Sequence, residues 1–287
     1  MSTQVSTAFV NQFSSNVNLL SQQMGSLLRG SVSEESVTGE KAFFDQVGSA
    51  AAQKRTTRHG DTPLMETPHS RRMVTIDTYE YADLIDDADK VRMLIDPTST
   101  YARAAAAAMG RAMDDAIISA ATGTALTGKA GATSTAIGSG QQIAHGSADL
   151  TLAKLLSAKK ILDENSVDPS IKRYIAVGPA QIEALLGVTQ VTSSDFASVK
   201  ALVQGDIDTF MGFKFITSTR LSVASSIRKC FAWAEDGIKL AVGKDVVAKI
   251  DERSDKSYST QVFYSSTFGA TRMEEAKVVE ISCDESA

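Results

Sequence analysis

Residues 123–129 come nearer to a known catalytic motif than any other segment of this sequence. Their letters, GTALTGK, match the first seven positions of the phosphate-binding P-loop, GxxxxGK. A phosphate cradle needs such a loop to leave a strand and open a helix, and it needs Ser or Thr after the lysine to bind magnesium. Here the loop follows a predicted helix, and Ala130 follows Lys129. We therefore expect a flexible loop and predict no cofactor.

The histidines and cysteines have no spacing typical of a metal or redox site. His59, His69 and His145 fall in predicted loops, and no two of them are one helical turn apart. Cys230 and Cys283 lie far apart in sequence and form no CxxC pair, as is typical of buried thiols in a reducing compartment. No GxSxG nucleophile elbow occurs. We predict no metal site and no catalytic residue, while a triad assembled from distant residues remains an open alternative.

Charged side chains of opposite sign gather in two neighbouring stretches. Residues 54–72 hold five basic and two acidic side chains, a net charge of +3. The basic ones are Lys54, Arg55, Arg58, Arg71 and Arg72. Residues 77–96 hold seven acidic and two basic side chains, a net charge of −5, and lack the alternating ligands and central glycine of an EF-hand loop. This segregation favours pairing between copies of the chain over nucleic-acid contact, and a solvated loop remains a third interpretation.

The composition is that of a globular protein with a sizeable core. The chain has 287 residues, of which 43% are hydrophobic and 22% are charged. Its net charge of −5 argues against a dedicated DNA-binding protein. The first charged residue is Arg29, and the uncharged stretch at 130–148 is rich in Gly, Ser, Thr and Gln. We therefore expect neither a cleaved signal peptide nor a membrane span.

The elements that must position these side chains follow from the periodicity of apolar residues. Intervals of three and four predict an amphipathic helix over 8–28 that docks against protein. From 39 to 72 the periodicity is lost, as in a long excursion of the chain that forms an arm, a lid or a disordered linker. β-Branched and aromatic residues at 73–81 predict a strand that returns along this excursion as a long hairpin. The capping sequence DPTS at 96–99 then opens an alanine-rich helix that ends near Gly123.

The second half of the chain predicts mainly short strands. A Gly/Ser/Thr-rich connection at 123–148 leads to a helix at 149–164, and a strand at 171–177 precedes a helix at 179–187. We expect four leucines of the helix at 149–164 to face the core: Leu152, Leu155, Leu156 and Leu162. Further strands are predicted at 212–217, 230–234, 238–242, 246–250, 260–268 and 277–281. Helices early and strands late indicate an α+β fold.

Several local motifs occur in the first part of the chain. They are AAQK at 51–54, RHGDTPL at 58–64, TPH at 67–69, ADLID at 82–86, LIDPTS at 94–99 and AMDD at 112–115. With the order of elements, they resemble the major capsid proteins of tailed bacteriophages with the Hong Kong ninety-seven type fold. The close similarity covers about residues 8–121, and beyond that the order of elements carries the resemblance.

The resemblance implies a domain organisation. It comprises an N-terminal arm at 1–38, an extended E-loop at 39–80, a peripheral domain at 81–165 with a spine helix at 97–121, an axial domain at 166–244, and closing strands of the peripheral domain at 245–287. It implies a structural protein, not an enzyme, that self-assembles as hexamers and pentamers into an icosahedral head around double-stranded DNA. The implied location is the virion, after assembly in the host cytoplasm. Other implied partners are the packaged DNA, through weak non-specific contacts, and portal, scaffold and decoration proteins.

Under this interpretation the segregated charges acquire a role at an interface. We expect the five basic side chains of 54–72 to lie across Asp83, Asp86 and Asp87 of an adjacent copy. Some members of the fold crosslink through a loop lysine, but no matching Asn or Glu accompanies Lys54, so no crosslink is predicted. Three alternatives remain: an encapsulin-like nanocompartment shell, a nucleotide-binding α+β enzyme that uses residues 123–129, and a nucleic-acid-binding module that uses the basic arm.

Overall fold

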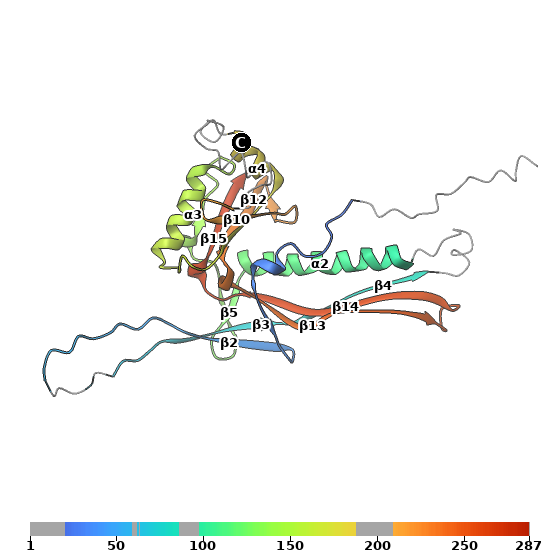
Figure 1. Ribbon diagram of the computed structural model, residues 1–287, viewed down its shortest axis with the longest axis horizontal. Coiled ribbons are helices and arrows are strands. Elements are labelled where there is room, and N and C mark those ends of the chain that lie inside the picture. The colour runs from blue at the N-terminus through green and yellow to red at the C-terminus, as the bar shows by residue number, and fades with distance from the viewer. Residues whose placement is uncertain (1–20, 59–61, 63, 86–97, 188–208, 287) are drawn as a thin grey trace, which may run out of the picture. The chain divides into compact units, whose positions relative to one another are not determined.

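The computed structural model describes residues 21–58, 62, 64–85, 98–187 and 209–286 (Figure 1). Contacts divide the chain into two compact units. One comprises Met1–Ser26, Thr78–Ala112 and Lys244–Ser266, and the other comprises Leu27–Asp77, Met113–Gly243 and Thr267–Ala287. Helices and strands both contribute to the fold, so the α+β prediction is confirmed.

A seven-stranded sheet lies in the second unit. Its strand order is β7-β15-β12-β8-β10-β9, and β11 pairs with β12. The strands are β7 (Gln142–Ile143), β8 (Arg173–Val177), β9 (Thr209–Phe210), β10 (Phe213–Thr217), β11 (Val223–Ala224), β12 (Ile227–Ala234) and β15 (Val278–Asp284). All five residues of β8 are buried, as expected for a central strand covered on both faces. The Trp233 ring stacks on Tyr174 and donates its Nε1 hydrogen to the Ser31 carbonyl at 2.9 Å.

Two helices accompany this sheet, α3 (Leu152–Glu164) and α4 (Pro179–Gly187) (Figure 1). The hydroxyl of Thr151 caps α3 by accepting from the Lys154 amide, and Pro179 occupies the first position of α4, where no amide is needed. Leu155 and Leu162 are fully buried, but Leu156 is 51% exposed, so the prediction that it faces the core is wrong. Leu156 follows Leu155 by one residue, a rotation of about 100° that takes it off the apolar stripe.

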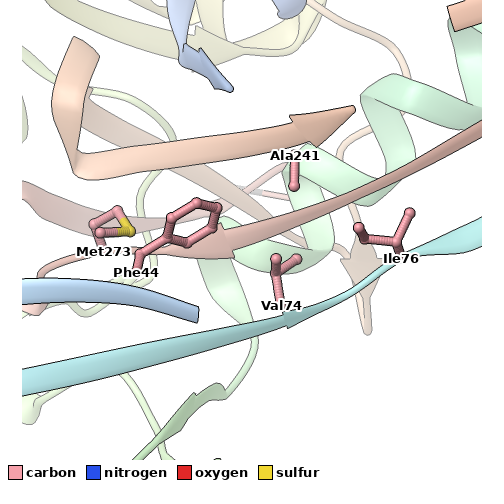
Figure 2. Packing of buried hydrophobic residues seen from close by; sticks show 5 residues of the cluster. All are labelled: Phe44, Val74, Ile76, Ala241 and Met273. Carbon is pink, nitrogen blue, oxygen red and sulfur yellow. The ribbon is translucent and has the colours of Figure 1, made fainter. Parts of the chain in front are cut away.

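The predicted hairpin is confirmed. Strands β2 (Lys41–Val47) and β3 (His69–Thr75) pair antiparallel, from Lys41 opposite Thr75 to Val47 opposite His69. They belong to a four-stranded sheet, β2-β3-β5-β6, with β5 (Ala125–Thr127) and β6 (Thr133–Thr135). Figure 2 shows the apolar cluster at the base of the hairpin, which contains Phe44, Val74, Ile76, Ala241 and Met273. The excursion thus has a core at its base although the sequence shows no periodicity there.

A third sheet has the order β1-β13-β14-β4 and contains the longest strands. Its members are β1 (Ser33–Ser36), β4 (Asp77–Ile85), β13 (Ile238–Arg253) and β14 (Ser259–Arg272). The strands predicted at 238–242 and 246–250 are one continuous strand, β13. The single strand predicted at 73–81 is instead divided between β3 and β4, with Ile76 buried between them.

The predicted alanine-rich helix is α2 (Thr98–Thr122), and its capping residues Asp96 and Pro97 lie outside the described residues. Its small side chains permit close approach of another segment. A Cβ atom added to Gly110 would lie 2.3 Å from the Gly25 carbonyl carbon, so the chain near Gly25 rests directly on the helix.

Two predictions about local structure need correction. Of the helix predicted at 8–28, residues 21–28 are not helical, and the remainder lies outside the described residues. The amides of Leu27 and Leu28 donate to the Asp114 carboxylate, each at 3.1 Å, so a tertiary contact replaces helical hydrogen bonds. The connection at 123–148 contains β5, β6 and β7, with Ala125 and Ile137 buried, and is therefore more ordered than a plain loop.

Short 3-10 turns complete the fold: η1 (Arg29–Ser31), η2 (Ser139–Gln141), η3 (Glu235–Gly237) and η4 (Glu275–Lys277). Within the described part of the chain, no helix combines the length and apolarity needed to cross a membrane.

Candidate functional site

The excursion beyond the β2–β3 hairpin presents basic and apolar side chains to solvent. Hairpin pairing continues to Gly48, whose amide donates to the Pro68 carbonyl at 2.8 Å, and the described residues beyond it form no helix or strand (Figure 1). Lys54, Arg55 and Arg58 are exposed. Leu64 is 95% exposed, more than any other large apolar side chain in the described residues. The described residues of the chain therefore leave this side chain almost entirely uncovered.

Arg71 is occupied within the hairpin. It lies opposite Asp45 in the β2–β3 register, and its Nε and a terminal nitrogen donate to the two carboxylate oxygens at 2.5 and 3.0 Å. Its guanidinium also lies 5.5 Å from the centre of the Phe43 ring. The hydrogen bond from Arg71 holds the pKa of Asp45 below its ordinary value, and the same bond raises the pKa of Arg71. Because both groups face solvent, this pair orients side chains more than it stabilises the fold.

Arg72 faces the interior instead. It is only 7% exposed, its Nε donates to the Met273 carbonyl at 2.7 Å, and a terminal nitrogen donates to the Glu275 carboxylate at 2.6 Å. Gln46 donates to the same Met273 carbonyl at 2.9 Å. Arg72 therefore fastens the base of the hairpin to the segment after β14, although the sequence analysis grouped it with the exposed basic side chains of 54–72.

The acidic members of the predicted interface lie partly in the described chain. Asp83 is half-buried on β4, where its carboxylate accepts from the Leu84 amide at 2.9 Å and from the Tyr81 hydroxyl at 3.4 Å. Burial, with Asp83 as a second cause, raises the pKa of Tyr81. Asp86 and Asp87 lie outside the described residues.

The sequence analysis missed three side chains that make structural contacts at the hairpin and at the end of α2: Asp45, Arg272 and Glu275. Asp45 could have been found by writing out the hairpin register, which places it opposite Arg71. Arg272 is fully buried, and it donates to the carbonyls of Ala121 at 3.0 Å and Gly123 at 2.8 Å, closing the end of α2. Glu275 lies three residues after Arg272, with a carboxylate oxygen 3.7 Å from its Nε, but their other partners are more than a hundred residues away, so no local signal shows what these two side chains hold together.

The GTALTGK segment is a strand and a tight turn, not a phosphate cradle. Residues 125–127 form β5, and the Gly131 amide donates to the Gly128 carbonyl at 3.0 Å, closing the turn to β6. Both glycines have positive φ, +89° and +67°. A Cβ on Gly131 would lie 2.4 Å from the Met73 sulfur, so the turn sits tightly on β3. The lysine of the motif opens no helix, which a phosphate cradle would require.

An open groove of about 740 Å³ lies at the base of the hairpin, between β2, β3 and the β5–β6 turn. Its charged lining residues are Asp45, Arg71, Arg72 and Lys129, and His69 and several hydroxyls complete it. Among the described residues, no group of three His, Cys, Asp or Glu side chains is arranged to hold a metal ion.

The two cysteines are buried free thiols, as the sequence predicts. They lie on adjacent strands, because Cys230 pairs with Ile281 and Cys283 pairs with Arg228 in the β12–β15 register. The hydrogen bond with Cys283, together with burial, raises the pKa of Cys230 well above its ordinary value. A raised pKa keeps the thiol protonated and unreactive.

Comparison with known proteins agrees with this architecture. No curated protein matches the chain. Its fold matches the capsid of the cyanophage P-SCSP1u, with a TM-score of 0.76 at 18% identity over 98% of this chain and 94% of that one. It also matches the capsid of the Helicobacter pylori bacteriophage KHP30, with a TM-score of 0.75 at 10% identity over 99% and 97% of the two chains. The capsid of Ralstonia phage GP4 gives a TM-score of 0.74 at 11% identity over 96% and 95%.

The family comparison decides the identity, because it covers nearly the whole chain. The model of the phage capsid protein family matches residues 5–285. The expected Hong Kong ninety-seven type fold agrees with the solved phage capsids that the chain resembles. The chain therefore belongs to the phage capsid protein family and is a structural major capsid protein of the virion.

Proposed function

We propose that copies of this chain form the hexamers and pentamers of an icosahedral head that encloses double-stranded DNA. The observation that carries the proposal is the exposed excursion of the β2–β3 hairpin, where Leu64 is 95% exposed and Lys54 and Arg58 have no hydrogen bond or ion pair within the described residues. Such a segment buries its apolar surface only against another molecule. Repetition of one contact around closed symmetry would give a shell.

The domain organisation belongs to this proposal. Residues 1–38 would be the N-terminal arm and 39–80 the E-loop, followed by the peripheral domain at 81–165. Residues 166–244 would form the axial domain at the centre of each hexamer and pentamer. Residues 245–287 would return to the peripheral domain. The fully described hairpin base and helix α2 support the E-loop and spine-helix assignments.

We propose a charged interface with fewer intersubunit residues than the sequence predicts, because Arg72 contacts its own chain. Lys54, Arg55 and Arg58 extend from the arm toward the acidic stretch of a second copy, which includes Asp83, Asp86 and Asp87. Arg71 would also contact that stretch through its exposed edge, although Asp45 already balances most of its charge. Arg72 contributes indirectly, because it holds the base of the hairpin within its own chain. Many weak exposed pairs, repeated over the shell, would set register and assembly order.

The remaining partners follow from the same proposal. Packaged DNA would touch the shell through weak non-specific contacts, and portal, scaffold and decoration proteins would be additional partners. Assembly would take place in the host cytoplasm. The chain would act as a building block without enzymatic activity. An encapsulin-like shell is the alternative within the fold, and it differs in enclosing protein cargo.

Expression of the chain, size-exclusion chromatography and negative-stain electron microscopy test self-assembly. Closed or curved shells are the expected result, and their nucleic-acid or protein content separates a phage head from a nanocompartment. The variant Lys54→Glu/Arg55→Glu should reduce the yield of shells, whereas the matched exposed pair Lys159→Glu/Lys160→Glu on α3 should not. A chain that stays small even with its co-expressed neighbouring genes would contradict the proposal.

A further inference from the structure

The groove at the base of the hairpin carries one unmatched positive charge. Asp45 balances Arg71, and Glu275 balances Arg72. Lys129 is exposed and has no hydrogen bond or ion pair among the described residues. The single carboxylate of the lining, Asp45, is already in use. The groove therefore has room and charge for an additional carboxylate from outside.

The turn that carries Lys129 is held in a fixed position. Gly128 and Gly131 take up the positive φ angles of the turn, and Gly131 packs against the Met73 side chain without space for a Cβ. The Gly128 amide donates to the Arg71 carbonyl at 3.3 Å, which ties the turn to β3. A lysine on such a turn is presented beside the groove at a defined place, although its own side chain is flexible. Gly128 therefore serves the geometry of the turn, and Lys129 supplies positive charge beside the groove.

We propose that this groove receives a carboxylate of strand β4 from a second copy of the chain, with Lys129 as its counter-charge. Strand β4 carries Asp77, Glu80 and Asp83 and no basic residue. Asp77 and Glu80 are exposed and have no ion pair within the described residues. Strand β4 stands at the end of its sheet order, β1-β13-β14-β4, so one of its edges has no strand neighbour in the described structure. The inference rests on the proposed self-assembly.

Size and charge favour a protein segment as the occupant. A groove of about 740 Å³ accommodates several side chains of an extended strand. Binding along a nucleic-acid backbone requires several phosphate contacts from basic side chains, and here only Lys129 has an unmatched charge. The net charge of the chain, −5, also opposes a polyanion.

Zero-length crosslinking of assembled shells tests the assignment directly. Shells are formed from an equal mixture of unlabelled and ¹⁵N-labelled chains, treated with a carbodiimide that joins lysine to carboxylate, digested and analysed by mass spectrometry. We expect Lys129 joined to Asp77 or Glu80, with mixed isotope pairs that identify two different chains. Lys129→Arg keeps the charge but not the reactive amine, so its shells should form normally and lose this crosslink.

A pair of charge reversals provides a second test. Lys129→Glu should raise the subunit concentration needed for assembly several-fold. Adding Glu80→Lys to the same chain should bring that concentration part of the way back to the unaltered value. The control Lys159→Glu should leave the concentration unchanged. Normal shells in which Lys129 joins only carboxylates of its own chain, or none, would overturn the groove assignment and leave self-assembly standing. If the unaltered chain forms no shells, the proposed self-assembly is itself contradicted. A DNA oligonucleotide that binds the subunit and loses affinity in Lys129→Glu would identify nucleic acid as the occupant and overturn the assignment.

Discussion

The guanidinium of Arg72 donates a hydrogen bond to the carboxylate of Glu275 at 2.6 Å, across 203 residues of sequence. The other oxygen of that carboxylate lies 3.7 Å from Nε of Arg272, which is fully buried. Burial lowers the pKa of Arg272, with Glu275 acting in the opposite direction. One carboxylate thus serves two arginines, one from the hairpin base and one that closes the end of α2.

Glu275→Gln should therefore destabilise the unassembled subunit by about 2–3 kcal/mol, because it leaves two guanidinium groups without their counter-charge. Asp45→Asn is the matched control, since it removes the carboxylate partner of the exposed Arg71 and should change stability little. Urea unfolding followed by circular dichroism measures both. Equal losses in the two variants would contradict the role assigned to Glu275.

Arg272→Lys should loosen the C-terminal end of α2. The arginine reaches the carbonyls of Ala121, Gly123 and Thr135 from two different nitrogens, a span that a lysine ammonium does not reproduce. Hydrogen–deuterium exchange should become faster in the last turn of α2 and in β5. Arg103→Ala, at an exposed position on the same helix, should leave exchange there unchanged. Unaltered protection in Arg272→Lys would show that the helix end does not depend on this side chain.

Gly131→Ala should destabilise the β5–β6 turn by roughly 1–3 kcal/mol, because the added methyl group meets Met73 and the backbone has a positive φ. Gly140→Ala is the control, since a Cβ there would have open space. Thermal unfolding of the two subunits provides the comparison. The prediction is falsified if Gly131→Ala melts at the same temperature as Gly140→Ala.

The pH dependence of stability should contain a contribution from Glu285. The hydrogen bond from Arg228 holds the pKa of Glu285 below its ordinary 4.5. The folded chain then binds this proton less readily than the unfolded chain, so the stabilisation is complete above the unfolded value and disappears as the pH falls through the folded one. Glu285→Gln should be less stable than the unaltered chain near neutral pH, and the difference should shrink as the pH falls below 4.5. A difference that stays constant over this range would exclude the linkage.

The sequence predicts elements whose signals are local. Helix α2 has its alanines and its DPTS start within one segment, and the returning strand of the hairpin follows from the β-branched and aromatic residues at 73–81. Strand β2, in contrast, lies in the stretch where the periodicity is lost. The contacts that decide the role of Arg72 are not local, because a basic residue paired with Glu275 looks in sequence like any arginine of the arm. The segment at 21–28 has helical periodicity, yet Asp114 takes two of its amides, so a tertiary contact overrides the pattern. Strand β13 is likewise continuous through residues 243–245, where the sequence predicts a break.

The apolar tip of the excursion gives the clearest separation of folding from assembly. Leu64 is 95% exposed, so Leu64→Ser removes almost no burial from the isolated subunit and should leave its unfolding midpoint unchanged. In a shell that covers the side chain, the same substitution removes apolar contact at every repeated interface, and the yield of particles should fall. Leu156→Ser on α3 is the matched control, since that leucine is 51% exposed. Particle yield from light scattering, set beside subunit stability, distinguishes the outcomes: equal particle yields from Leu64→Ser and Leu156→Ser would mean that the tip is not an assembly contact, and a parallel loss of stability in Leu64→Ser would mean that it is held within its own chain.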